Sequence, residues 1–132
     1  MKKKPEWVLP ETVLTLHEQL LAEFGGLSGV RDAKLLDSAL ARPKNLVAYG
    51  RPDAFDLAAS YGFGIVKNHP FNDGNKRTGF AVAVLFLELN GYRFQAAEAD
   101  AIVRTLALAA GAMKEAEYAA WLKANSSRHQ GI

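Results

Sequence analysis

The chain has 132 residues, enough for one domain that buries roughly two-thirds of its unfolded surface and too few for two ordinary domains. Hydrophobic residues make up 49% and charged residues 23% of the sequence, which excludes low-complexity and disorder-prone compositions. The net charge of +2 does not by itself indicate a nucleic-acid partner, and the absence of cysteine excludes disulfide frameworks and thiolate metal sites.

The sequence predicts neither secretion nor membrane insertion. The basic start, residues 1–4, is followed by PEWVLPE, which lacks the apolar run of a signal peptide. The longest apolar run, residues 79–87, has nine residues, far below the about 18 of a membrane span. We therefore expect a soluble protein, and the missing cysteines fit a reducing cytoplasm.

Two helices are predicted in the first third of the chain. Apolar residues recur at helical spacing from Glu11 to Phe24, and two glycines follow. A second helix begins after a cap at Asp32 and is expected to end at Pro43, because proline removes a backbone donor. The segment 43–53 has two prolines and a glycine, and we predict a loop long enough to be a functional flap.

The remainder predicts four more helices. Asp53 is expected to cap a mostly buried helix, in which Gly62 and Gly64 indicate close approach to a neighbour. The next helix, from residue 75 to the Asn90–Gly91 stop, is apolar nearly all round, which is typical of a central helix. The other predicted elements are a short extended piece at 92–94 and helices within 97–112 and 114–126.

These elements predict an all-α fold, a compact single-domain bundle of about six helices. We expect an extended N-terminal segment at residues 1–10, the domain at 11–127 and a C-terminal tail at 128–132.

The segment KNHPFNDGNKRTGF, residues 67–80, carries the candidate site. Pro70 places His69 at the end of one helix, and Asn72 or Asp73 is expected to cap the next. Lys76 and Arg77 then fall in the first turn, where the helix dipole disfavours cations and where free amides and bases together bind phosphate.

This arrangement predicts phosphoryl or nucleotidyl transfer. Gly74 lets the backbone approach a ligand, Asp73 is a hard oxygen ligand suited to Mg²⁺, and His69 can take a proton from an attacking hydroxyl. Each residue also has a structural explanation: Asp73 as a cap, His69 as a helix-end side chain, Lys76 and Arg77 as solvated bases and Phe71 as a core anchor. Their coincidence at one helix start favours the functional interpretation.

The string HPFNDGNKR resembles the Fic motif H-P-F-x-[D/E]-G-N-G-R-x-x-R of the Fic/Doc superfamily. Lys76 replaces the glycine after Asn75, and Phe80 replaces the second arginine. Both departures are features of the death-on-curing (Doc) branch, whose motif H-x-F-N-D-[A/G]-N-K-R-T is matched by residues 69–78 throughout. The resemblance extends to residues 16–43 and 85–94 and implies the Fido fold.

The resemblance implies a toxin of a toxin–antitoxin pair that transfers the γ-phosphate of ATP to a threonine of elongation factor Tu and stops translation. By this resemblance His69 is the base, Asp73 holds Mg²⁺, and Gly74, Asn75, Lys76 and Arg77 contact phosphates, with Lys76 and Arg77 also catalytic. Ala81 stands where a polar residue of the next helical turn is expected.

The resemblance further makes residues 43–53 the flap that aligns a target peptide by main-chain pairing. The sequence lacks the inhibitory [S/T]-x-x-x-E-[G/N] helix of self-inhibited Fic proteins, so a separate antitoxin is expected. Two other functions remain open: AMP transfer by the same His69 and Asp73, and a catalytically idle module that binds nucleotide or antitoxin. Direct nucleic-acid binding ranks last, because the basic residues are scattered.

Overall fold

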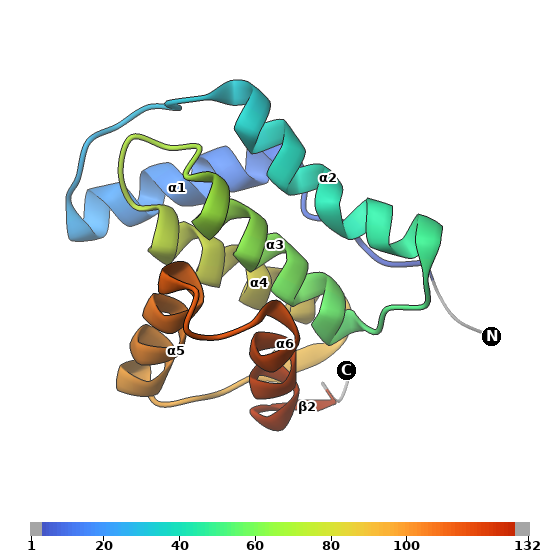
Figure 1. Ribbon diagram of the computed structural model, residues 1–132. Coiled ribbons are helices and arrows are strands. Elements are labelled where there is room, and N and C mark those ends of the chain that lie inside the picture. Colours follow the sequence, from blue (N-terminus) through green and yellow to red (C-terminus); the bar gives the residue numbers. More distant parts are fainter. Residues whose placement is uncertain (1–3, 129–132) are drawn as a thin grey trace.

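The computed structural model describes residues 4–128, and in this range the chain forms six helices and two short strands (Figure 1). The helices are α1 (Pro10–Phe24), α2 (Ala33–Tyr49), α3 (Ala54–Asn68), α4 (Asn75–Leu89), α5 (Glu98–Ala110) and α6 (Glu115–Ala124). The strands β1 (Tyr92–Phe94) and β2 (Ser126–Arg128) pair antiparallel. The all-α prediction is confirmed. The predicted N-terminal segment and C-terminal tail fall partly outside the described residues.

Helix α3 lies at the centre of the bundle and packs against α2, α4, α5 and α6 (Figure 1). Ten of its fifteen residues are buried, against seven of fifteen in α4. The expectation that the helix starting at residue 75 is the central one is therefore wrong. Helix α4 packs against α3, α1, α5 and β1, and part of its apolar surface, including Phe80, is only half-buried.

Small residues set the spacing between the helices, as predicted for Gly62 and Gly64. A methyl group on Gly62 would stand 3.3 Å from the carbonyl oxygen of Gly79 in α4, and one on Gly64 would stand 3.1 Å from the Cα of Ala39 in α2. The backbones of α3 and α4 thus touch where glycine faces glycine. This contact fixes the loop between these two helices, which carries the candidate site.

Helix α2 does not end at Pro43 but continues to Tyr49. A proline inside a helix costs about 3 kcal/mol relative to alanine, because it removes a hydrogen bond and crowds the preceding turn. Here the apolar face continues past it: Leu36, Pro43 and Leu46 share one face, Pro43 is buried, and Leu46 packs on the core. Burial of this face offsets the local cost. The predicted flap at 43–53 is wrong, since only residues 50–53 lie outside helices.

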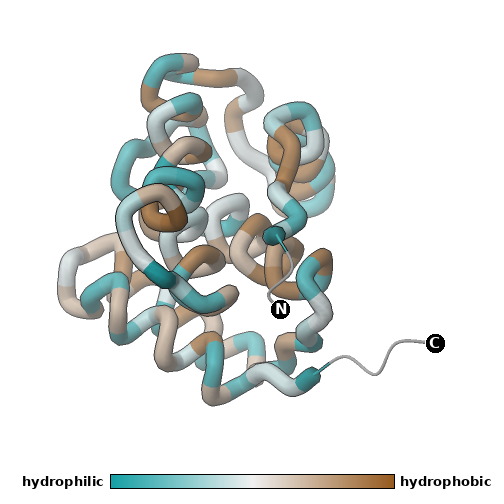
Figure 2. Tube along the Cα trace, turned by 90° about the vertical axis from the view of Figure 1, so that its right-hand side faces the viewer, coloured by the Kyte–Doolittle hydropathy of each residue, from teal (hydrophilic) through white to brown (hydrophobic). Residues whose placement is uncertain are grey.

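The carboxyl-terminal part closes the bundle beneath α3 and α4 (Figure 1). Phe80 of α4, Phe94 of β1 and Trp121 of α6 form an aromatic cluster, with ring centroids 5.2 to 6.3 Å apart. Along the helices in Figure 2 brown and teal segments alternate, which is the pattern of helices with one face buried. Within residues 4–128 no helix has both the length and the apolar character that a membrane crossing requires.

Candidate functional site

The candidate site is the loop between α3 and α4, residues 69–74, with the first turn of α4. His69 is the C-cap of α3 and has φ 53° and ψ 54°, the left-handed region. Among residues 4–128 it is the one non-glycine residue with positive φ. Its N–H donates to the carbonyl oxygen of Ile65 (3.1 Å), which confirms that α3 ends just before it. The exposed imidazole is thus presented at the helix end.

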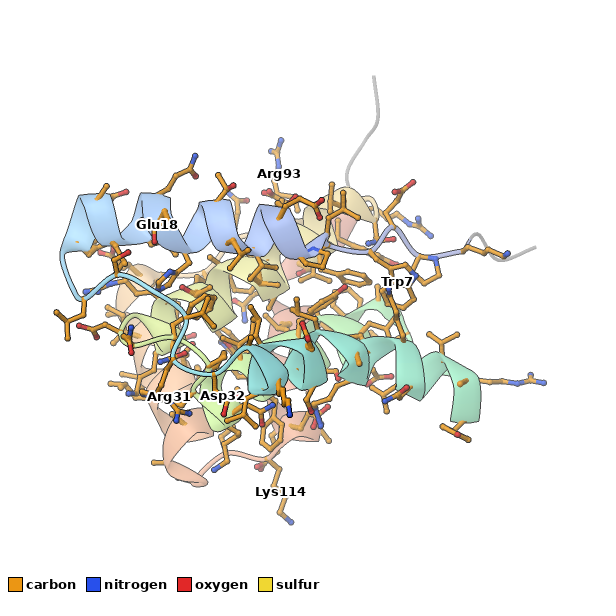
Figure 3. The ribbon with its side chains drawn as sticks, turned by 90° about the horizontal axis from the view of Figure 1, so that it is seen from above. Trp7, Glu18, Arg31, Asp32, Arg93 and Lys114 are labelled. Atoms are coloured by element: carbon orange, nitrogen blue, oxygen red, sulfur yellow. The ribbon has the colours of Figure 1, made fainter. Side chains whose placement is uncertain are left out.

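Arg31 holds this unusual backbone from outside. Its Nε donates to the carbonyl oxygen of His69 (2.8 Å) and its guanidinium also donates to that of Asn68 (3.0 Å). Both acceptors belong to the C-terminus of α3, where the helix dipole favours a cation. Arg31 lies beside Asp32 where the connection from α1 reaches α2 (Figure 3).

The connection between α1 and α2, residues 25–32, runs alongside the site loop (Figure 1). Val30 and Phe71 form an antiparallel bridge, and the N–H of Asn72 donates to the carbonyl oxygen of Gly29 (3.0 Å). The backbone N–H groups of residues 31 and 32 both donate to the carbonyl oxygen of Pro70. The extended segment beside the site is therefore residues 25–32 and not residues 43–53.

Neither Asn72 nor Asp73 caps α4, contrary to the sequence prediction. The N-cap is Gly74, with φ 77°, and no side chain bonds the first turn. Asn72 donates from its side chain to the carbonyl oxygen of Ser28 (2.9 Å), while Asp73 accepts the N–H of Leu27 on Oδ2 (3.2 Å) and that of Gly74 on Oδ1 (3.0 Å). The connection between α1 and α2 attracts both side chains, so the first amides of α4 keep no side-chain partner.

Asn75 supports the loop with its side chain. The residue is 4% exposed, its Oδ1 accepts the N–H of Phe71 and its Nδ2 donates to the carbonyl oxygen of Phe71, both at 3.0 Å. Phe71 itself is fully buried, as the anchor role predicts. Because both polar atoms of this side chain bond Phe71, only the backbone N–H of Asn75 is left for the predicted phosphate contact.

Lys76 and Arg77 are exposed in the first turn of α4. Within residues 4–128, neither lies within 4.0 Å of a carboxylate. The guanidinium of Arg77 stacks over the ring of Phe24, with Cζ 4.3 Å from the centroid. Two cations and uncapped amides therefore share one helix start, which is the arrangement of an anion site.

Sequence reasoning missed His17 of α1, which supports the loop from below. It is 2% exposed, its ring stacks on Phe71 at 3.8 Å between centroids, and its Nε2 lies 2.8 Å from the carbonyl oxygen of Asp73. A carbonyl only accepts, so Nε2 carries the proton. The signal was its spacing, because a histidine four residues after the buried Val13 falls on the core face of α1.

Asp73 is the candidate metal ligand of this loop. No group of three or more histidine or acidic side chains able to hold a metal occurs in the part of the chain that the structure describes. Mg²⁺ needs less from the protein, since it takes one or two carboxylates and completes its shell with substrate phosphate and water. The carboxylate of Asp73 is exposed, keeps free lone pairs and is oriented by two backbone amides, so it fits such an ion.

The side chains of the candidate site, His69, Asp73, Lys76 and Arg77, are exposed. Two surface hollows, of about 430 and 480 Å³, are lined by residues of α1 with Leu85, and by residues of α2, α3, α6 and the connection at 50–52, and neither includes residues 69–77. An enclosed pocket is the usual form of a small-molecule site. An open face also admits the surface of another protein.

The model of the Fic/DOC family matches residues 7–87. The chain belongs to the Fic/DOC family. It is 36% identical to the protein kinase doc of Escherichia phage P1 over 85 residues, which are 64% of this chain and 68% of that protein. It is 46% identical to the toxin Doc of Mycolicibacterium smegmatis over 94 residues, 69% of each chain. It is thus a Doc-like member.

One position explains how this Fic/DOC protein departs from the Fic motif. Phe80, in place of the motif's second arginine, is half-buried against Phe94 and Trp121. It lies three residues after Arg77 and contributes to the core instead of the site. Ala81, where a polar residue was expected, is half-buried as well.

Proposed function

We propose that this chain is the toxin of a toxin–antitoxin pair and that it transfers the γ-phosphate of ATP to a hydroxyl of a target protein, a threonine of elongation factor Tu. The observation that carries the proposal is the start of α4. There an exposed histidine, His69, and the carboxylate of Asp73 precede the cations of Lys76 and Arg77 at a helix start whose amides no side chain caps. The names of the two relatives, a protein kinase and a toxin, support the same function.

Each residue has a role in this reaction. His69 takes the proton of the attacking hydroxyl, and its left-handed backbone presents the ring from the end of α3. The amides at 75–77 and the side chains of Lys76 and Arg77 bind the phosphates, and Gly74 leaves them room. Asp73 would hold Mg²⁺, which when bound neutralises phosphate charge.

The target side of the site is supported by the connection between α1 and α2. Residues 25–32 pair with the site loop along one edge, through Gly29 and Val30. This extended segment is the one beside the site to which we assign main-chain pairing with a target segment. This segment takes the role that the sequence assigned to residues 43–53.

The proposed partners follow from the reaction and from the relatives. A toxin requires an antitoxin, and we assign control to a separate polypeptide. A target in translation places the reaction in the cytoplasm. Nucleic acid is not proposed as a direct partner, because the basic side chains are dispersed: Arg93 and Lys114 point outward on opposite sides in Figure 3.

AMP transfer is the second candidate reaction, since it uses the same histidine and acid. Two observations favour phosphoryl transfer over it. The second arginine of the Fic motif is absent, and Phe80 in its place faces the aromatic cluster. Lys76 occupies space that the Fic glycine leaves open to a diphosphate.

The proposed function is tested by incubating the purified chain with elongation factor Tu, Mg²⁺ and ATP labelled on either the γ- or the α-phosphate. We expect the γ label alone to reach the target on a threonine, and none to reach it with the His69→Asn variant. Transfer of the α label would establish AMP transfer instead. An unlabelled target in both reactions would support the idle binding module.

A further inference from the structure

One face of α1 lies against the start of α4. His17, Leu21 and Phe24 are spaced i, i+4 and i+7 and so share a face. His17 bonds the carbonyl oxygen of Asp73, and the Cδ2 of Leu21 is 3.4 Å from the position that a methyl group on Gly74 would occupy. Phe24, the last residue of α1, lies under the guanidinium of Arg77.

The contact between Phe24 and Arg77 leaves the donors of the arginine free. In residues 4–128 no carboxylate lies within 4.0 Å of Arg77, so no acid competes with an incoming phosphate. A guanidinium that stacks through its flat face keeps its N–H groups available in the plane, where they bind phosphate bidentately. Ring stacking therefore restricts the side chain without occupying its donors.

Phe24 is not needed for the core. The residue is 49% exposed and does not belong to the buried cluster, so its ring leaves apolar surface in water. His17, by contrast, is almost fully buried and holds the loop itself.

We propose that Phe24 is a positioning residue, which holds the guanidinium of Arg77 over its ring so that the arginine meets a phosphate of the nucleotide in one orientation. The inference rests on the proposed function in taking ATP as the anion. Without the ring, a long exposed side chain must be ordered at the moment of binding.

The test is a titration of ATP with Mg²⁺ onto the full chain and its variants. Phe24→Leu is expected to weaken ATP binding by about two- to five-fold, the factor typical of an exposed cation–π contact. Phe24→Tyr keeps the ring and is expected to bind like the parent. Tyr49→Leu is the matched control, because Tyr49 is also an exposed aromatic at the last residue of a helix, far along the chain from the site.

A role through Arg77 is separated from a merely structural role by repeating Phe24→Leu in an Arg77→Gln background. We expect no further loss of ATP affinity there, and the same thermal midpoint for Phe24→Leu as for the parent. The inference is overturned if Phe24→Leu loses as much ATP affinity in the Arg77→Gln background as in the parent, or if Phe24→Leu and Phe24→Tyr lose equal affinity. It is also overturned if Phe24→Leu binds ATP as tightly as the parent.

The positioning role of Phe24 and the proposed kinase reaction can fail separately. If ATP binding depends on Phe24 and Arg77 but no label reaches the target, the positioning role stands and the kinase proposal fails. If the parent transfers the γ label and Phe24→Leu keeps parental ATP affinity, the kinase proposal stands and the positioning role fails.

Discussion

His69 has a backbone conformation that the chain between residues 4 and 128 otherwise leaves to glycine, with φ 53°. Histidine is among the residues that tolerate this region, but the conformation still has to be held by its surroundings. Arg31 does this through the carbonyl oxygens of His69 and Asn68. The conformation is thus held by a residue 38 positions earlier in the sequence, and no local pattern around Pro70 reveals this contact.

Replacing His69 by alanine is expected to lower phosphate transfer to the target by on the order of 10²- to 10⁴-fold, the range for removal of a general base. Little packing is lost, because the side chain is exposed. Label transfer and circular dichroism of the purified variant check the two parts of this expectation.

His69→Asn is the matched control for the backbone. Asparagine adopts the left-handed region readily but cannot replace the imidazole as a base at neutral pH. We expect it to be as inactive as His69→Ala and more stable. A folded variant of either kind that transfers phosphate at the parental rate would remove His69 from the mechanism.

Lys76→Gly is expected to lower γ-phosphate transfer on the order of 10²-fold, because it removes a cation beside the transferred group. Lys34→Gly is the matched control, since Lys34 is likewise exposed and is the second residue of its helix. The Lys34→Gly change has the same cost in helix propensity but lies outside the site, so this variant is expected to transfer the γ-phosphate at the parental rate. Transfer is followed with α- and γ-labelled ATP in parallel.

A gain of AMP transfer is not expected from Lys76→Gly alone, because the second arginine of the Fic motif is still missing. Adding Phe80→Arg would supply that arginine but would disturb the aromatic cluster. That change would place a charge against Phe94 and Trp121 and destabilise the fold. Should Lys76→Gly retain full γ transfer, lysine would not be the determinant that separates the two reactions.

At the scale of elements, the six helices followed from apolar periodicity, while their limits depended on tertiary contacts. The local cost of a proline inside a helix predicted that α2 ends at Pro43, yet burial of its apolar face lets the helix continue to Tyr49. Asp73 predicted a cap for α4, yet its carboxylate accepts the N–H of Leu27. The residues of the candidate site were visible in the sequence because they adjoin one another, whereas His17 and Arg31 support it from elsewhere.

Gly79→Ala is expected to destabilise the protein, although alanine is the better helix former by about 1 kcal/mol. The new methyl group would stand 2.8 Å from Cγ2 of Val66 and 3.0 Å from the carbonyl oxygen of Gly62, and the second contact is with backbone that cannot move aside. Overpacking of this kind costs about 1 to 3 kcal/mol. Denaturant unfolding measures the net effect.

Ala81→Gly is the control for Gly79→Ala. It measures the difference in helix propensity between alanine and glycine at a half-buried position of α4, two residues further along. It is expected to cost about 1 kcal/mol through propensity alone. If Gly79→Ala instead stabilises the protein by that amount, the backbones of α3 and α4 are not in contact at this point.

For the molecule as a whole, two buried or half-buried contacts close the bundle below α3. Trp121 of α6 donates from Nε1 to Oδ2 of Asp100 in α5 (2.8 Å), and this bond, with that from Arg104, lowers the pKa of the Asp100 carboxyl. The hydroxyl groups of Thr105 in α5 and Tyr118 in α6 lie 2.9 Å apart. The carboxyl-terminal helices are therefore joined by polar contacts as well as by the aromatic cluster.

The stability of the whole molecule is expected to fall at alkaline pH because of Tyr118. Burial raises the pKa of its hydroxyl from 10.0 to about 12, so between these values the folded state keeps a proton that the unfolded chain has released. The free energy of unfolding then decreases as pH rises through this range. Tyr118→Phe should weaken this decrease, leaving the part due to Tyr61, whose pKa burial also raises.

At neutral pH the Tyr118→Phe variant is expected to be less stable than the parent by about 1 to 3 kcal/mol, since the buried hydroxyl of Thr105 loses its partner. Urea unfolding of both proteins at pH about 8 and about 11.5 measures both effects, and equal alkaline losses in the two would contradict the assignment.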